Sequence, residues 1–241
     1  MRWNSEVLPA EISSTSPRVH AHRRRVGRRR IFAARADERR PLLHLALTRA
    51  VSAALPLAGL TALQALVDHA KLQPGERVLV HGGTGGVGAL TVQLATILGG
   101  KVTTIIRSDS SDLVRDFGAQ RVIDTRSEAF DATGTAYDVV IDTVGGQTLD
   151  RSFAVLRPGG RLVTLSAPPP AGKADEYHVT ATFFIVTPNR DQLAELAALL
   201  DRGQLKVEIA NTFALADGRQ AFESGTNAHR RPGKTVIIVR D

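Results

Sequence analysis

The glycines of the segment Gly83-Thr-Gly-Gly-Val-Gly88 are the residues whose spacing most directly suggests chemistry. They fit the pattern G-x-G-x-x-G and follow an apolar run that ends at His81. Glycine lets a phosphate approach the backbone, and the amides at the start of a helix offer free N–H groups to it. We expect Gly83 to allow a tight turn, Gly85 to admit a pyrophosphate, and Gly88 to let helix and strand pack closely. A purely structural glycine turn gives the same pattern.

The residues that follow the next apolar run should choose between two dinucleotides. An acid at the end of that strand binds the ribose hydroxyls of NAD, whereas a basic residue accommodates the additional phosphate of NADP. Arg107 follows the run directly, and the Ser108 hydroxyl can donate a hydrogen bond to phosphate. These residues favour NADP(H), while Asp109 keeps NAD(H) open. The alternative for Arg107 is an ordinary solvent-facing side chain.

The sequence offers no convincing catalytic acid–base or metal centre. It has no cysteine, which excludes disulfides and thiolate ligands, and its seven histidines show no metal-ligand spacing. We therefore expect no metal, zinc included, and we assign no catalytic residue. His81 is interpreted as a strand-end packing residue, and Asp138 and Asp142 as hydrogen-bonding groups at the two ends of an apolar strand.

Alternating strands and helices should position the glycine turn. Runs that are apolar almost throughout indicate parallel strands buried on both faces, with right-handed crossovers through the intervening helices. The expected class is α/β, a Rossmann-type doubly wound parallel sheet with helices on both faces. The expected strands are 77–81, 101–106, 121–124, 137–142, 161–166 and 179–186, and the expected helices are 60–70, 88–98, 111–117, 148–156 and 190–202.

Six ordered motifs extend over residues 53–241. They are Ala53–Ala62, Gly75–Gly88, Phe117–Asp124, Tyr137–Gly146, Leu156–Val163 and Gly233–Val239. Together they resemble the zinc-independent quinone oxidoreductase and enoyl reductase branch of the medium-chain dehydrogenase/reductase superfamily. The resemblance implies an NADP(H)-dependent oxidoreductase that transfers hydride to a small molecule, either a quinone or an α,β-unsaturated carbonyl.

The resemblance also implies roles for individual residues. Thr61, Val144, Ser166, Phe183 and Phe184 should lie near the nicotinamide half of the cofactor; Gly85, Gly86 and Val87 should hold the pyrophosphate, and Arg107 and Ser108 the 2′-phosphate. As alternatives, Thr61 is a cap at a helix start, and Val144 and the two phenylalanines are core residues. Edge pairing of the strand around Thr180–Val186 is expected to make a homodimer.

The chain departs from this family at its N-terminal end. Members begin with a β-rich, GroES-like domain that forms the opposite wall of the substrate cleft, and residues 1–52 are too few and of the wrong composition to build it. We expect a poorly ordered basic arm over 1–52, an NADP-binding Rossmann domain over 53–205, and a C-terminal β remnant of the truncated catalytic domain over 206–241. Thr125 replaces a tyrosine often found in the family, which loses one cofactor contact.

The net charge of +7 comes from the N-terminal arm. Residues 1–40 contain eleven arginines, no lysine and four acids, whereas the rest of the chain is balanced. A solvated arm is the plainest interpretation; a phosphate-binding arm lacks aromatic residues to stack on bases, and a mitochondrial-type presequence conflicts with the acids. Nucleic acid is therefore not an expected partner. With no apolar run of about 18 residues, we expect no membrane segment and a cytoplasmic protein.

Two functions follow from these observations. The first is an NADP(H)-dependent reductase, impaired by loss of its substrate domain. The second is a dinucleotide-binding module or sensor without turnover. Hydride transfer of this type needs little acid–base machinery, because the cofactor supplies the chemistry and the protein positions the reacting carbon. Turnover, rather than cofactor binding, distinguishes the two functions.

Overall fold

The structure, a computed structural model, describes residues 48–134, 136–226 and 231–239, so the basic arm before residue 48 lies outside the described residues. The helices and strands alternate along most of the chain, as expected. In chain order they are α1 (Arg49–Gln64), η1 (Ala65–His69), β1 (Arg77–His81), α2 (Gly88–Ile97), β2 (Lys101–Ile106), α3 (Ser111–Asp116), β3 (Arg121–Asp124), η2 (Phe130–Thr133), β4 (Tyr137–Asp142), α4 (Gly146–Arg151), η3 (Ser152–Val155), β5 (Leu156–Thr164), α5 (Lys173–Glu176), β6 (Thr180–Phe183), α6 (Arg190–Asp201), β7 (Ile209–Ala214), η4 (Leu215–Asp217), α7 (Gly218–Thr226) and β8 (Lys234–Ile238).

Six parallel strands form one sheet in the order β3-β2-β1-β4-β5-β6. The order reverses at β1, which pairs with β2 on one side and with β4 on the other. β1 and β4 are buried along almost their whole length, which explains why their sequences are apolar without alternation. The expected doubly wound α/β fold is confirmed, and a ligand site is expected beyond the carboxyl ends of these two strands.

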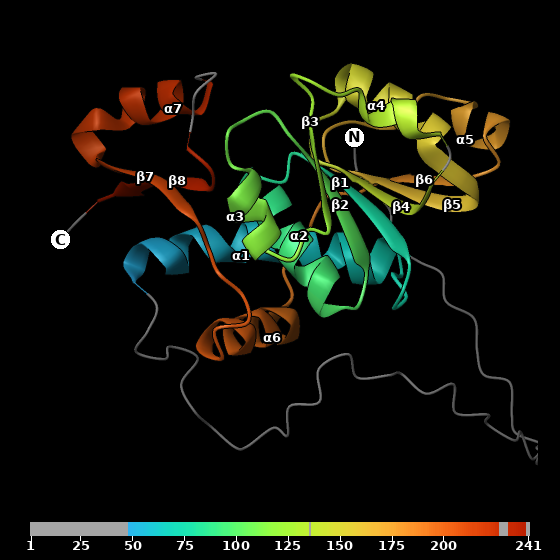
Figure 1. Ribbon diagram of the computed structural model, residues 1–241. Coiled ribbons are helices and arrows are strands. Elements are labelled where there is room, and N and C mark those ends of the chain that lie inside the picture. Colours follow the sequence, from blue (N-terminus) through green and yellow to red (C-terminus); the bar gives the residue numbers. More distant parts are fainter. Residues whose placement is uncertain (1–47, 135, 227–230, 240–241) are drawn as a thin grey trace, which may run out of the picture. The chain divides into compact units, whose positions relative to one another are not determined.

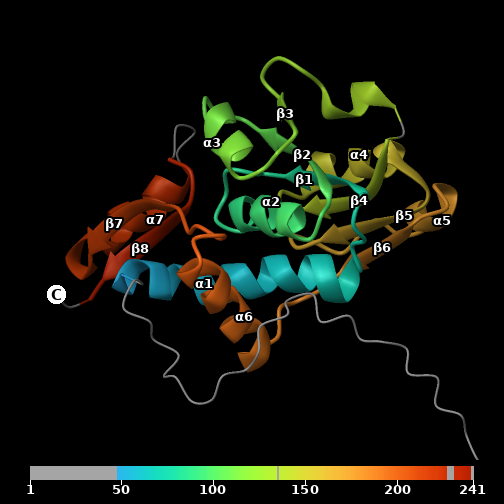
Figure 2. The same cartoon turned by 60° about the horizontal axis from the view of Figure 1, so that its bottom comes forward.

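Helices lie on both faces of the sheet. α1 and α6 lie on one side and α4 on the other (Figure 1, Figure 2). α1 begins where the Thr48 hydroxyl accepts a hydrogen bond from the Val51 amide. α1 and α6 approach closely at Gly59, where a Cβ would stand 2.9 Å from Leu196 Cδ1. The sequence around the first helix therefore fits close helix–helix packing.

α1 starts well before the helix expected at residue 60, and upstream of the domain boundary expected at residue 53. Pro56 lies inside it. Proline and glycine disfavour an isolated helix, but the packing of α1 against α2 and α6 outweighs this preference. Thr61 consequently lies inside the helix, so the alternative of a helix-start cap is wrong.

The segment Arg49–His69 is also long and apolar enough to cross a membrane, with 21 residues and a mean hydropathy of 1.7. The sequence contains no uninterrupted apolar run here, because uncharged polar residues such as Ser52 and Gln64 separate the apolar ones. These polar residues interrupt the apolar run in the sequence, but the mean hydropathy of the helix remains high. Of its most apolar stretch, 56% is buried against the rest of the protein, as for the core helix of an α/β domain.

Three other boundaries differ from expectation. β5 begins at Leu156, because that residue pairs with Tyr137 of β4. The helix expected over 148–156 consists instead of α4 followed by the 3-10 turn η3, and it ends one residue earlier, at Val155. β6 ends at Phe183, where its pairing with Thr164 of β5 also ends. β6 is nevertheless the edge strand of the sheet, as the sequence predicted for Thr180–Val186.

The residues after α6 form a second sheet of two parallel strands, β7 and β8, which are connected through α7. The N-terminal end of β8 reaches the glycine turn: the Gly233 amide donates a hydrogen bond to the Thr84 carbonyl (2.9 Å), and Gly233 forms a β-bridge with Gly85. This contact brings the C-terminal segment to the predicted phosphate-binding end of the large sheet.

Candidate cofactor-binding site

Two adjoining cavities lie beyond the carboxyl ends of the central strands. The first, of about 450 Å³, lies between the glycine turn and the C-terminal segment. The second, of about 740 Å³, is lined by residues at the ends of β1, β2 and β3 and by the turn after β4. Gly85, Thr143 and Gly225 line both cavities. The glycine turn therefore stands between them, where a doubly wound sheet binds its ligand.

The glycine turn depends on one positive φ and on two close approaches. Gly82, which precedes the motif, has the positive φ of the tight turn (+70°). At Gly83 a Cβ would stand 2.0 Å from the Thr104 hydroxyl oxygen of β2, and at Gly88 a Cβ would stand 2.1 Å from the Gly82 carbonyl oxygen. Helix and strand can approach this closely only because these positions lack side chains. No side chain among the described residues caps α2. The Gly85 and Ala89 amides donate to the carbonyls of Gly82 (2.8 Å) and Gly85 (2.9 Å), which leaves the amides from Gly86 to Gly88 for an anion.

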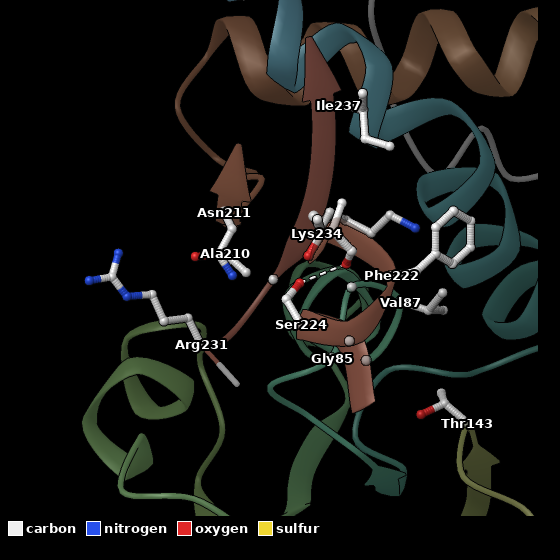
Figure 3. Close-up of a pocket in the computed structure, with 16 residues that line it drawn as sticks. Gly85, Val87, Thr143, Ala210, Asn211, Phe222, Ser224, Arg231, Lys234 and Ile237 are labelled. Carbon is white, nitrogen blue, oxygen red and sulfur yellow. Dashed lines mark hydrogen bonds between the residues drawn. The ribbon is translucent and has the colours of Figure 1, made fainter. Parts of the chain in front are cut away.

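The first cavity has a basic rim that comes from the C-terminal segment (Figure 3). Gly86, Val87 and Gly88 line this cavity, and so do Arg231 and Lys234. The Lys234 side chain crosses over Gly86, where an added Cβ would stand 2.2 Å from Lys234 Cδ. Cations near the amides at the start of α2 make this cavity suitable for a phosphate group.

The second cavity contains an unsatisfied hydroxyl at the corner after β2. Arg107 and Ser108 line the cavity there. The Ser108 Oγ is buried and has no hydrogen-bond partner among the described residues. Buried hydroxyls normally have a partner, so this one suits a ligand group that accepts a hydrogen bond. A guanidinium and a serine hydroxyl at this corner fit a phosphate.

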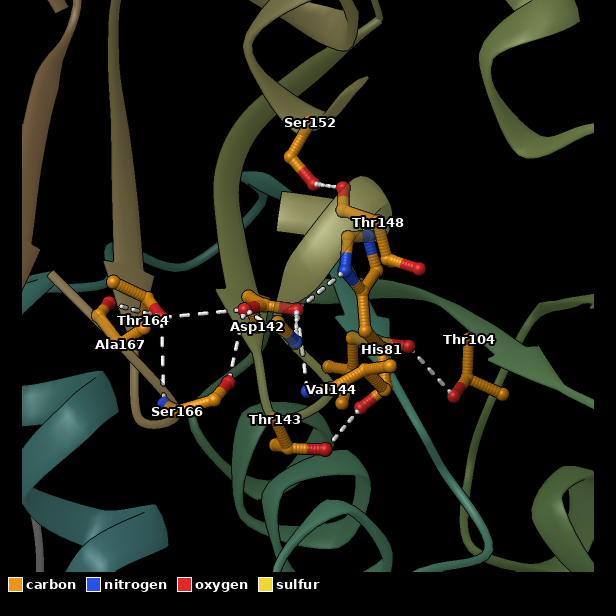
Figure 4. A network of polar contacts seen from close by, with 12 residues as sticks. His81, Thr104, Asp142, Thr143, Val144, Thr148, Ser152, Thr164, Ser166 and Ala167 are labelled. Atoms are coloured by element: carbon orange, nitrogen blue, oxygen red, sulfur yellow. Dashed lines mark hydrogen bonds and ion pairs between the residues drawn. The ribbon is translucent and has the colours of Figure 1, made fainter. Parts of the chain in front are cut away.

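Asp142 organises the turn between β4 and α4 (Figure 4). Its carboxylate accepts hydrogen bonds from the amides of Gly145 (3.0 Å) and Val144 (3.2 Å) and from the hydroxyls of Thr164 (3.2 Å) and Ser166 (3.4 Å). A fifth contact joins it to His81 Nδ1 at 3.0 Å. This network fixes the backbone that presents Val144 to the second cavity.

The Asp142–His81 pair is completely buried. Burial raises the pKa of Asp142, but the hydrogen bond and charge of His81 and the amides of Gly145 and Val144 outweigh it, so this pKa lies below its ordinary value. Asp142 is therefore a structural anion, as the sequence suggested for a strand-end hydrogen-bonding group. His81 also packs against Phe130, with ring centroids 5.1 Å apart.

The structure brings together most of the residues predicted to hold the cofactor. Gly83 lines neither cavity but lies within the glycine turn, packed against Thr104 of β2. Those lining the cavities are Gly85, Gly86, Val87, Gly88, Arg107, Ser108 and Val144. Val144 has 55% of its surface exposed, so the alternative of a core residue is wrong for it. Thr125 lines the second cavity in place of the tyrosine common in the family.

Four other predicted site residues line neither cavity. Thr61 donates its hydroxyl to the Leu57 carbonyl within α1, and Ser166 reaches the site only through Asp142. Phe184 is buried and stacks on His69, with ring centroids 4.0 Å apart, which fits the alternative of a core residue. Phe183 is the last residue of β6. Their proximity to a nicotinamide stays a prediction.

Some residues at the site carried no role in the sequence interpretation. From the C-terminal segment these are Arg231 and Lys234, and from the main sheet Thr143, Arg126 and Arg151. Lys234 belongs to a motif that the sequence contains, Gly233–Val239, but no local pattern shows that this motif reaches Gly85. That contact depends on the path of the chain through β7 and α7.

Comparisons with known proteins agree with this geometry. A family model described as zinc-binding dehydrogenase matches residues 117–237. The chain is 35% identical over 202 residues to the spectinabilin polyketide synthase system protein NorB of Streptomyces orinoci. It is 33% identical over 194 residues to an NADPH-dependent alkenal/one oxidoreductase, chloroplastic, of Arabidopsis thaliana. The structure of the quinone oxidoreductase from Coxiella burnetii matches with a TM-score of 0.72 and 34% identity.

The matched regions cover most of this chain but only part of each relative. They span 78% of this chain in both curated relatives, against 9% of the Streptomyces protein and 47% of the Arabidopsis protein. For the Coxiella structure the values are 80% of this chain and 62% of that chain. The similarity therefore covers the parallel sheet and the C-terminal segment but leaves much of each relative unmatched.

The residues present do not fit a zinc ion, although the matching family model is described as zinc-binding. The chain contains no cysteine. Within the described ranges, no group of three or more histidines, cysteines and acids lies close enough to hold a metal. We derive no step through zinc.

Proposed function

Because the chain belongs to the zinc-binding dehydrogenase family of the medium-chain dehydrogenase/reductase superfamily, we propose that it binds NADP(H) and transfers hydride to a quinone or an α,β-unsaturated carbonyl without zinc. The buried, unpartnered Ser108 hydroxyl carries the cofactor assignment. Ser108 lies beside Arg107 in the second cavity, which Gly85 of the glycine turn also lines. A dinucleotide whose pyrophosphate binds at the turn could therefore place an additional phosphate at Arg107 and Ser108.

The residues of this chain would divide the cofactor among three contacts. The amides from Gly86 to Gly88, the exposed backbone of Gly85, and the cations Arg231 and Lys234 would hold the pyrophosphate. Arg107 and Ser108 would hold the 2′-phosphate. When bound, NADPH supplies the hydride.

The turn after β4 would position the nicotinamide half. Asp142 fixes the amides of Val144 and Gly145, and this keeps Val144 exposed at the cavity wall. A rigid turn of this kind limits the orientations of a bound ring, which is the main contribution a protein makes to hydride transfer. No proton donor is assigned to a residue of this chain.

The substrate class rests on the relatives. The Arabidopsis protein is named for alkenals and alkenones and the Coxiella protein for quinones, and both classes accept hydride at an electron-poor carbon. The first cavity is bordered by Phe222, which is 81% exposed, so this wall offers an apolar surface to a flat substrate. A small quinone or enone is accordingly the proposed substrate.

The proposal is tested by following NADPH absorbance in the presence of an aromatic ortho-quinone or a crotonyl-type enone. We expect oxidation above background, and we expect Ser108→Ala to raise the KM for NADPH about tenfold, the effect of a lost hydrogen bond to a charged group. Ser127→Ala is the matched control, because Ser127 lines the same cavity but already donates its hydroxyl to the Asp124 carbonyl.

Two outcomes would contradict parts of the proposal. If both serine variants behave alike, the 2′-phosphate assignment is wrong. If NADPH binds and neither substrate is reduced, the chain is a dinucleotide-binding module or sensor instead of a reductase.

A further inference from the structure

The corner after β2 contains two opposite signals for cofactor choice. Arg107 and Ser108 suit a phosphate, but Asp109 follows immediately, and a carboxylate at this place normally accepts hydrogen bonds from the ribose hydroxyls of NAD. A free carboxylate would also repel the 2′-phosphate of NADP. The selectivity of the corner therefore depends on what holds the Asp109 side chain.

Arg126, from the turn after β3, holds it. Its Nη2 donates a hydrogen bond to Asp109 Oδ1 at 2.6 Å, although the Asp109 side chain is otherwise 91% exposed. The same guanidinium binds Asp124, with Nε 2.9 Å from Asp124 Oδ2. The Arg126 backbone amide donates to Asp124 as well, at 3.0 Å. Arg126 is thus anchored on one acid and reaches the other.

The charges show the effect of this anchoring. Hydrogen bonding to Arg126 lowers the pKa of Asp124, and the two carboxylates raise the pKa of Arg126, so the charged forms of Asp124 and Arg126 stabilise each other. Asp109 does not line the second cavity, whereas Arg126 does. The guanidinium of Arg126 therefore lines the cavity proposed to bind the cofactor, and the carboxylate of Asp109 is directed toward that guanidinium.

Arg107 has the opposite situation. No ion pair of Arg107 occurs among the described residues, whereas Arg151, another cation of this cavity, is paired with Asp131. A guanidinium without an acidic partner is free to bind a phosphate. Asp109 is the nearest acid in the sequence to Arg107 and Ser108, so without Arg126 its carboxylate would lose the guanidinium that holds it.

We propose that Arg126 is a positioning residue for cofactor choice: by binding Asp109 it removes the carboxylate that would select NAD, and so leaves Arg107 and Ser108 to select NADP. This inference rests on the proposed function. Cofactor selectivity then depends on Arg126, in the turn after β3, as well as on Arg107 and Ser108 after β2.

The test is a double-mutant cycle on the full chain, with NADPH and NADH titrated separately by calorimetry. Arg126→Gln should weaken NADPH binding about tenfold relative to NADH binding, because Asp109 is released. Adding Asp109→Asn in the same chain should restore most of the lost NADPH preference. Asp109→Asn alone should change the preference less than twofold, and Arg126→Lys should retain most of it, because the ammonium still pairs with the acids.

Each alternative result identifies what has failed. If the unmodified chain binds neither cofactor, the proposed function fails and this inference with it. If the unmodified chain binds NADPH but Arg126→Gln leaves the NADPH-to-NADH preference unchanged, the inference alone is wrong. It is also wrong if Arg126→Gln loses the preference and Asp109→Asn does not restore it, since Arg126 then contacts the phosphate directly. Thermal unfolding of each variant verifies that it is folded.

Discussion

At the scale of single residues, Asp142 links the fold to the site. It is buried at the end of β4, and five groups contact its carboxylate, among them the two amides of the turn that presents Val144. A buried carboxylate with so many donors stabilises one backbone conformation. The sequence showed its position at a strand end, but not its partners, which come from β1 and from the end of β5.

Replacing this carboxylate should destabilise the protein markedly. We expect Asp142→Asn to lower the free energy of unfolding by about 3 kcal/mol, because an amide NH₂ meets the turn amides and leaves donors unpaired. This corresponds to a Tm lower by about 6–12 °C for a chain of this size. Asp138→Asn at the other end of β4 is the control: the Asp138 side chain is partly exposed (15%), pairs with Arg157 and accepts a hydrogen bond from the Arg77 amide, so it has fewer partners than Asp142 and the loss of stability should be smaller.

The effect of Asp142 should also depend on pH. Its pKa is lowered in the folded protein, so its stabilisation is fully present above the unfolded value of about 3.9 and is lost as pH falls through the folded pKa. The stability difference between the unmodified protein and Asp142→Asn should stay constant between about pH 5 and 7 and shrink below about pH 4. A difference that grows on acidification would contradict this assignment.

At the scale of elements, the glycine turn joins β1 to α2 through backbone contacts that only glycine permits. At Gly88 an added Cβ would meet the Gly82 carbonyl, which is backbone and cannot move aside. At Gly86 it would meet the far end of the Lys234 side chain, which can. Gly86 and Gly88, two glycines of one motif, therefore differ in whether a side chain can be accommodated.

These glycines give a matched pair of substitutions. Gly88→Ala should lower the free energy of unfolding by about 2 kcal/mol and the Tm by about 4–8 °C, because β1 and α2 must separate. Gly86→Ala should leave the Tm nearly unchanged, because Lys234 can adopt another rotamer. Thermal unfolding followed by circular dichroism measures both. Equal decreases of Tm in Gly88→Ala and Gly86→Ala would contradict the difference proposed between these two positions.

The elements also show how far the sequence could predict this structure. The central strands were predictable because each is a short apolar run bounded by turn residues, as Arg77–His81 and Tyr137–Asp142 illustrate. The start of α1 was not, because Pro56 and Gly59 oppose a helix locally and packing against α2 and α6 favours it. The basic rim of the first cavity was equally inaccessible, since Lys234 meets Gly86 through tertiary contacts across a long sequence separation.

At the scale of the whole molecule, β6 is one of the two edge strands of the large sheet, and among the described residues it pairs only with β5. Ile185, just beyond β6, is 76% exposed and lies within the segment Thr180–Val186 that the sequence assigned to a dimer contact. An apolar residue beside an unpaired edge favours association with another strand. We therefore propose a homodimer that pairs through this edge.

Sedimentation velocity tests this dimer. The unmodified chain should sediment as a dimer, and Ile185→Lys should shift it to a monomer without changing its Tm, because a side chain this exposed contributes little to the fold. Leu215→Lys is the control: it also replaces an exposed apolar residue, 60% exposed, but on η4 at the C-terminal segment. A monomeric unmodified chain, or dimers that persist in Ile185→Lys, would rule out this interface.

We propose that the two cavities beside the glycine turn form one site for NADP(H). Calorimetric titration of the full chain with NADPH and with NADH tests it most directly, with Gly86→Val as the variant whose side chain covers the amides at the start of α2. We expect saturable binding that is tighter for NADPH than for NADH and that is weakened at least tenfold in Gly86→Val. No saturable binding of either cofactor, or equal affinity in the unmodified chain and Gly86→Val, would contradict it.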